Sequence, residues 1–236
     1  MLNQTTHKNI LLRILKDIFS DNSINSALGF KGGTAAYLFY NLERFSVNLD
    51  FDLLDSAKED FIFNRIKAIL EEFGDLKEAE KKKFNLLFVL SYDNKEDNAQ
   101  NVKVEINRRD FESKYEVKSY LGISMKVMVK EDMFAHKLAA MYERIGKTNR
   151  DIFDTWFFLE NNWPINTQIV ENRASMPFKD FLIKCTDSLE KIDGAKILSG
   201  MGELLNESQK DWVKANLKNE VLFLLRLKLE EYKKIP

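Results

Sequence analysis

The chain has 236 residues, 44% of them hydrophobic and 31% charged, and its formal net charge is only −1. This composition is typical of a globular protein and excludes both a disordered chain and a strongly basic coat for nucleic acid. One cysteine and two histidines exclude a disulfide framework and argue against a cysteine- or histidine-based zinc site. Without an apolar run of about 20 residues or a clean apolar signal segment, we expect a soluble cytoplasmic protein with no membrane partner.

The first half of the sequence predicts a mixed α/β arrangement, because helical and alternating apolar patterns follow one another. Helices are expected at 8–20, 35–42 and 56–73. Strands are expected at 27–31, 49–53, 84–92, 102–107 and 125–129. A polar loop is expected at 93–101.

The second half predicts helices alone. They are expected at 131–145, 150–160, 178–191, 196–205 and 207–233. Residues 161–177 contain two of the three prolines and are expected to form a loop. We therefore predict an α+β chain with an α/β catalytic domain at 1–130 and a helical domain at 131–236 that contributes to the active-site cleft.

Three carboxylates point to metal-dependent chemistry. Asp50 and Asp52 alternate with apolar residues, so a strand places them on one face about 7 Å apart. Glu105 occupies the polar face of another predicted strand. Carboxylates this close repel one another unless a cation lies between them, and Mg²⁺ prefers such oxygen ligands.

A glycine turn before a helix adds a phosphate site. Gly32 and Gly33 let backbone N–H groups approach phosphate oxygens, and the following helix N-terminus favours negative charge. Thr34 adds a hydroxyl. Each feature alone has a plain structural explanation, as a helix cap or a solvated strand face. Their combination favours transfer from a nucleoside triphosphate.

The order of these motifs resembles the AbiEii/AbiGii-type toxin nucleotidyltransferases of the DNA polymerase β-like superfamily. The first motif is carried by Lys31–Ala35 and Arg44–Asp52, and the second by Glu105 in Val-Glu-Ile-Asn. Lys137 in Phe-Ala-His-Lys-Leu-Ala-Ala-Met resembles the third motif, and 150–154 (Arg-Asp-Ile-Phe-Asp) resembles the fourth. The resemblance implies a polymerase β-like mixed-sheet domain followed by an all-helical domain.

The resemblance also implies roles for individual residues. Asp50, Asp52 and Glu105 would hold Mg²⁺, and Asp154 would be the essential carboxylate of the last motif. The nucleotide would be bound by Gly32, Gly33, Thr34, Arg44, Ser46, Lys137 and Arg144. Helical spacing independently places Lys137 and Arg144 on one face, where solvated helix charges are the plain alternative. Asp151 and Asp154 could instead offset the helix dipole or pair with arginines.

One position departs from the family. Many members have an acidic residue before the Leu-Asp-x-Asp core, where this chain has Asn48. The carboxylates expected to bind the metal are retained, so the departure bears on substrate contacts.

The resulting hypothesis is a Mg²⁺-dependent nucleotidyltransferase that moves a nucleoside monophosphate from an NTP to an acceptor hydroxyl. The resemblance implies the toxin of a bacterial toxin–antitoxin or phage-defence system, a cognate antitoxin, and the 3′ end of tRNA as acceptor. The alternatives are a protein or aminoglycoside-like acceptor for the same chemistry, or a nucleotide-binding interaction module without turnover.

Overall fold

A computed structural model describes residues 3–92 and 100–233 of the chain. Most of the polar loop expected at 93–101 lies outside the described residues. The backbone divides into two compact units, Met1–Met128 and Val129–Pro236, whose boundary is two residues from the expected one. The mixed α+β fold and the C-terminal helices confirm the predicted fold class.

The N-terminal unit is built on one mixed sheet of seven strands, in the order β3-β4-β5-β2-β1-β7-β6. The pairs β1–β7 and β2–β5 are parallel, and the other neighbours are antiparallel. The strands are β1 (Leu28–Lys31), β2 (Leu49–Leu53), β3 (Asp75–Lys81), β4 (Asn85–Ser91), β5 (Asn101–Asn107), β6 (Tyr115–Tyr120) and β7 (Ile123–Met128).

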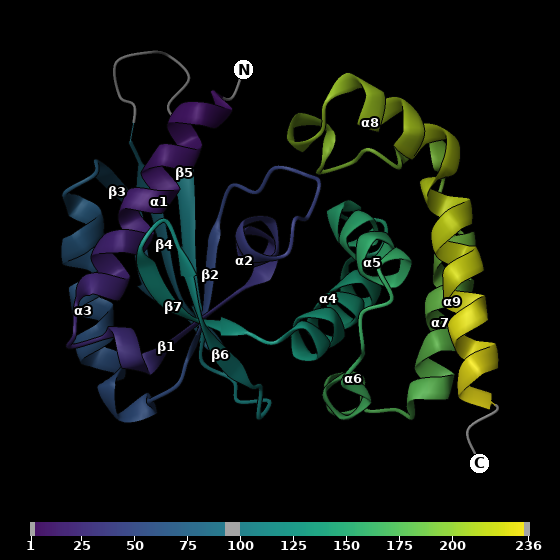
Figure 1. Cartoon of the computed structure of the whole chain (residues 1–236), viewed down its shortest axis with the longest axis horizontal. Coiled ribbons are helices and arrows are strands. Elements are labelled where there is room, and N and C mark those ends of the chain that lie inside the picture. The colour runs from purple at the N-terminus through teal and green to yellow at the C-terminus, as the bar shows by residue number, and fades with distance from the viewer. Residues whose placement is uncertain (1–2, 93–99, 234–236) are drawn as a thin grey trace. The chain divides into compact units, whose positions relative to one another are not determined.

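The two faces of this sheet differ in chemistry, because side chains alternate along each strand. Helices α1 (Gln4–Ser20) and α3 (Glu59–Glu71) cover the apolar face, and α2 (Gly32–Phe39) lies against the other side (Figure 1). The ring of Phe19 from α1 lies 6.5 Å from Phe30 and 6.1 Å from Phe51, centroid to centroid. The buried apolar face therefore fixes the opposite orientation for the polar residues of β2 and β5.

Two strands of the sheet were not predicted from the sequence. The strand β3 reads Asp-Leu-Lys-Glu-Ala-Glu-Lys and β6 reads Tyr-Glu-Val-Lys-Ser-Tyr. Both lie at the edges of the sheet, where charged side chains face solvent and protect the open backbone groups from pairing. Edge strands therefore lack the apolar alternation by which the inner strands were predicted.

The C-terminal unit consists of packed helices. They are α4 (Lys130–Arg144), α5 (Arg150–Glu160), α6 (Thr167–Ala174), α7 (Phe178–Glu190), α8 (Glu207–Trp212) and α9 (Lys218–Lys233), with a π-helical turn at Val213–Leu217. The Trp156 ring of α5 lies 4.3 Å from that of Trp212, and Phe158 stacks on Trp163 at 4.1 Å. Aromatic packing thus joins α5 to two later parts of the chain.

Two predictions in the second half are wrong in detail. The helix expected at 196–205 is replaced by short 3-10 turns at Gly194–Lys196 and Gly202–Leu204. Gly200, between them, has a φ of 75°, which a helix does not accommodate. The loop expected at 161–177 contains α6, capped by the Asn166 side chain. Among the residues described, no helix is both long and apolar enough to cross a bilayer.

A close contact between β1 and β6 explains why position 29 is a glycine. A Cβ atom on Gly29 would lie 2.3 Å from the Tyr115 ring, and the Tyr115 hydroxyl donates to Asp52 Oδ2 at 2.5 Å. The glycine lets the ring reach across β1 to β2. The contact ties the edge of the sheet to the polar residues at its centre.

Gly29→Ala should push the Tyr115 ring aside and lower the free energy of unfolding by about 1–3 kcal/mol. The loss should shrink in a Tyr115→Ala background, where the added methyl group has room. Urea unfolding of the four variants measures this coupling. Gly202→Ala, with no atom within 4 Å of its Cβ, is the control. Equal losses in both backgrounds would contradict the account.

Candidate active site

Two predicted acids meet on neighbouring strands. Because β2 and β5 pair in parallel register, Asp50 lies directly opposite Glu105. Both side chains line a pocket of ≈ 340 Å³, together with Lys31 at the end of β1. The remaining pocket lining is Phe51, Lys82, Lys83, Phe84, Asn85, Asn107 and Arg109. The pocket thus combines two carboxylates with four cationic side chains.

Asp50 lies against the start of α2. A Cβ on Gly32 would be 2.5 Å from Asp50 Oδ2, and the φ of Gly32 is 78°. Both the close approach and the left-handed backbone require glycine here. The first glycine of the predicted phosphate turn therefore places the helix N-terminus beside the Asp50 carboxylate.

Glu105 is held as an anion. The Asn85 amide donates to its Oε1 at 2.7 Å, and Lys103 forms an ion pair with Oε2. Burial acts to raise the pKa of Glu105, but the hydrogen bond and charge of Lys103, with Asn85 and the charge of Lys31, outweigh it and lower the pKa. Glu105 is therefore ionised at neutral pH and is a weak proton acceptor.

Asp52 is the most constrained of the three acids. It is 7% exposed, and three donors reach its carboxylate. Lys31 Nζ and Asn107 Nδ2 lie 2.5 and 2.6 Å from Oδ1, and Tyr115 Oη lies 2.5 Å from Oδ2. Across residues 3–92 and 100–233, no group of three or more His, Cys, Asp or Glu side chains forms a ready metal site.

The donors at this face fit a hard divalent cation. Asp50 and Glu105 offer carboxylate oxygens from one register pair, and such oxygens are the ligands Mg²⁺ prefers. Asp52 is on the same strand face but would join them only by giving up its contact with Lys31. A cation could thus be held first by the half-buried pair of Asp50 and Glu105.

The segment before β2 is fastened to α2 by predicted nucleotide-binding residues. The Thr34 hydroxyl donates to the Asn48 carbonyl, and its oxygen lies 2.9 Å from Ser46 Oγ. A Cβ on Gly33 would lie 2.9 Å from both Arg44 Nη2 and Ser46 Oγ. All three side chains, Thr34, Arg44 and Ser46, are buried. They hold the backbone that leads into β2 in place.

A buried histidine fixes the same segment from α1. His7 is 1% exposed, its Nε2 lies 2.9 Å from the Val47 carbonyl, and its Nδ1 lies 2.7 Å from the Tyr92 hydroxyl. A carbonyl can only accept, so Nε2 carries the proton and Nδ1 accepts from Tyr92. Burial lowers the pKa of His7, although the Val47 hydrogen bond opposes this, and a neutral imidazole anchors the chain just before β2.

The remaining candidates form a cluster in the C-terminal unit. Lys137 on α4 binds two acids of α5, with Nζ 3.1 Å from Asp151 Oδ1 and 2.8 Å from Asp154 Oδ2. Arg144 Nη2 lies 3.0 Å from Asp151 Oδ2. Both aspartates are fully buried, whereas the Arg144 side chain is 38% exposed. The predicted common face of Lys137 and Arg144 thus meets two compensating acids, and Asp151 contacts both cations.

Sequence reasoning missed several residues of the site. Asn107 follows Glu105 by two positions, so the alternation of β5 already placed it on the carboxylate face. Lys31 directly precedes the glycine turn that was singled out. Tyr115 and Asn85 carry no such signal, because the pairing of distant strands brings them to the acids.

The chain matches the family model of the nucleotidyl transferase AbiEii toxin of type IV toxin–antitoxin systems over residues 13–215. Because the match covers most of the sequence, the chain belongs to this family and is a nucleotidyltransferase. The family resemblance seen in the motifs is confirmed. Membership implies a nucleotide substrate and a cognate antitoxin. No curated protein matches the chain.

Solved structures share the fold. The JHP933 protein of Helicobacter pylori is similar over 99% of this chain and 96% of its own, at 21% identity and a TM-score of 0.60. MenT4, the nucleotidyltransferase toxin Rv2826c of Mycobacterium tuberculosis, is similar over 98% of this chain and 87% of its own, at 17% identity and a TM-score of 0.57. At these identities the likeness concerns the fold.

Removing the cation shared by the two buried acids should be costly. Lys137→Met should lower the free energy of unfolding by about 3–5 kcal/mol, because Asp151 and Asp154 would face each other without it. Urea unfolding measures the change. Adding Asp154→Asn should recover part of the loss. Lys214→Met, which removes a side chain 57% exposed and paired only at the surface, should change stability by less than about 1 kcal/mol. Equal effects of the two lysine substitutions would refute the buried role.

Proposed function

We propose that this nucleotidyltransferase moves a nucleoside monophosphate from an NTP to a hydroxyl at the 3′ end of tRNA, with Mg²⁺, in the cytoplasm. The observation that carries the proposal is the register pair of Asp50 and Glu105, set beside the glycines that open α2 and faced by cations. Such a site matches a substrate whose charge is concentrated in phosphates.

The protein groups divide the work of binding. The Gly32–Gly33 backbone at the start of α2 would take the triphosphate, because a helix N-terminus offers N–H donors and a favourable dipole. Lys31, 18% exposed and already in the pocket, would exchange its contact with Asp52 for phosphate. Asp50, Asp52 and Glu105 would hold Mg²⁺, which when bound offsets the phosphate charge and lowers the pKa of the acceptor hydroxyl.

The transfer itself forms one bond and breaks one. The acceptor oxygen attacks the α-phosphorus, and the bond to the oxygen bridging the α- and β-phosphates breaks, releasing pyrophosphate. The hydroxyl proton leaves to the solvent that fills the pocket. The proposal also gives Lys137 a phosphate-directed role and Asp154 the role of holding Lys137 in place.

The proposal predicts radiolabelled RNA when the protein is incubated with each α-labelled NTP, Mg²⁺ and total tRNA. Asp50→Asn should reduce transfer by at least about 100-fold with the fold unchanged, because the isosteric amide lacks the negative charge that binds a divalent cation tightly. Asp60→Asn, on an 86% exposed acid of α3, should retain full transfer. Undiminished transfer by Asp50→Asn would contradict the site.

The fractions that carry label decide the acceptor. Label in RNA supports tRNA, and label in protein or in an aminoglycoside would replace tRNA by that acceptor while leaving the chemistry intact. Tight binding of Mg·NTP without release of pyrophosphate would contradict turnover. Co-expression with the product of the neighbouring gene tests whether an antitoxin opposes the activity.

A further inference from the structure

An exposed aromatic ring stands in the wall of the carboxylate pocket. Phe84 is 49% exposed and occupies the turn between β3 and β4. The turn is fixed from below, because the Arg108 amide donates to the Phe84 carbonyl at 2.8 Å and Arg108 Nη1 donates to the Lys82 carbonyl at 2.7 Å. Arg108 is itself paired with Glu59 at 2.8 Å. A rigid backbone therefore presents an apolar face to a polar pocket.

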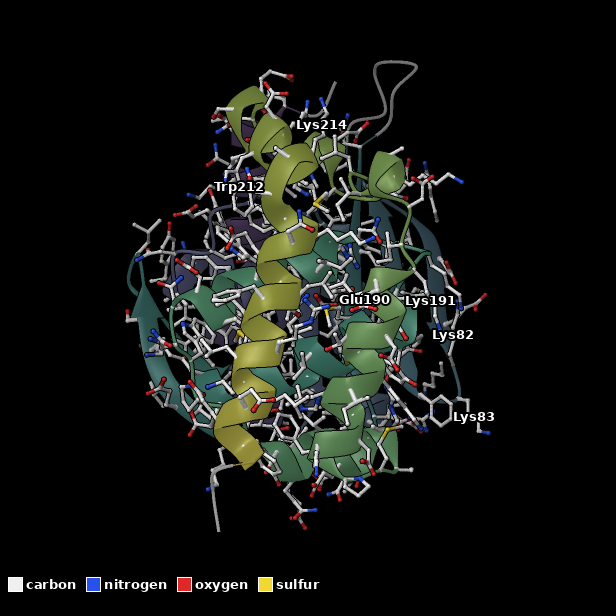
Figure 2. The ribbon with its side chains drawn as sticks, turned by 90° about the vertical axis from the view of Figure 1, so that its right-hand side faces the viewer. Lys82, Lys83, Glu190, Lys191, Trp212 and Lys214 are labelled. Carbon is white, nitrogen blue, oxygen red and sulfur yellow. The ribbon has the colours of Figure 1, made fainter. Side chains whose placement is uncertain are left out.

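Two cations lie over this ring and would share it with, or move aside for, a stacked base. Lys83 Nζ lies 5.0 Å and the Arg109 guanidinium carbon 5.2 Å from the centroid of Phe84, and Arg109 also lies 5.4 Å from the ring of Phe111. Arg109 Nε donates to Asn107 Oδ1 at 3.2 Å, which links the guanidinium to the face of Asp52. Figure 2 shows Lys82 and Lys83 projecting from this turn.

The flanking cations keep charge available for a ligand. Lys82 is paired with Glu78 at 2.6 Å, but within the described part of the chain neither Lys83 nor Arg109 forms an ion pair. An aromatic face beside two such cations matches a nucleobase with its adjoining phosphate, because bases of any identity stack on aromatic rings while cations track the backbone. The base of the NTP and a base of an RNA strand share this chemistry.

The order of strands favours the RNA. Moving along the sheet, Gly32 follows β1, Asp50 lies on β2, Glu105 on β5, and Phe84 precedes β4. The carboxylates therefore lie between the expected triphosphate site and the aromatic ring. Phosphoryl transfer needs the attacking and leaving oxygens roughly in line on opposite sides of phosphorus. The ring is on the side from which the acceptor would approach.

We propose that Phe84, Lys83 and Arg109 form the acceptor platform, on which a base of single-stranded RNA next to the reacting end stacks while its phosphate binds the two cations. This inference rests on the proposed function and adds to it the residues that receive the acceptor. The acceptor platform should bind RNA of any sequence, because stacking contacts the face of a base and not the edge by which bases differ.

The test measures binding and turnover separately. Anisotropy of a short dye-labelled single-stranded RNA gives binding without NTP, and steady-state transfer gives the KM for NTP and for RNA. Phe84→Ala should weaken RNA binding about 5- to 150-fold, and Phe84→Tyr should restore it, because stacking contributes about 1–3 kcal/mol per base. The KM for NTP should not change. Phe61→Ala, a 51% exposed ring on α3, is the matched control.

A second probe separates stacking from charge. Inorganic polyphosphate, which has no bases, should bind Phe84→Ala as it binds the wild type and should bind Lys83→Met/Arg109→Met more weakly. Unchanged RNA binding by Phe84→Ala would overturn the platform. A raised KM for NTP with unchanged RNA binding would assign the ring to the donor base and overturn it too.

The two proposals fail in different ways. RNA binding that depends on Phe84 in a protein that transfers nothing would leave the platform standing and contradict the transfer. Efficient transfer that does not depend on Phe84 would support the proposed function and contradict the platform.

Discussion

The parallel register of β2 and β5 is the constraint on which the site depends. It sets Asp50 opposite Glu105, and a slip of either strand by one residue would turn that strand's carboxylate into the apolar face. The register is fixed from the other side of the sheet, where Phe51 packs against Phe30 and Phe19. Hydrophobic packing by α1 and α3 thus determines where the acids point.

The acids are kept close by cations and donors supplied by the same unit. Lys31, Asn107 and Tyr115 converge on Asp52, while Lys103 and Asn85 hold Glu105. The C-terminal unit offsets carboxylate charge in the same way, since Lys137 lies between two buried aspartates. Repulsion between carboxylates is therefore offset locally in both units by cations and hydrogen-bond donors.

The sequence predicted elements whose pattern reflects burial and missed those whose pattern does not. The strand at 49–53 and the helix at 150–160 follow from apolar spacing, whereas the charged edge strand β3 does not. Asp50, Glu105 and Gly32 were identified from residue type and order. Tyr115 and Asn85 join the site through pairing of distant segments, which no local pattern encodes.

The central claim is that Asp50 and Glu105 act as one cation site. Electron paramagnetic resonance of Mn²⁺, titrated in the presence of a non-hydrolysable NTP analogue, tests it most directly. Asp50→Asn and Glu105→Gln should each weaken binding by at least about tenfold, and the double variant should be little worse than either, because residues that share one site are not additive. Unchanged Mn²⁺ binding in both single variants, or fully additive losses, would contradict the account.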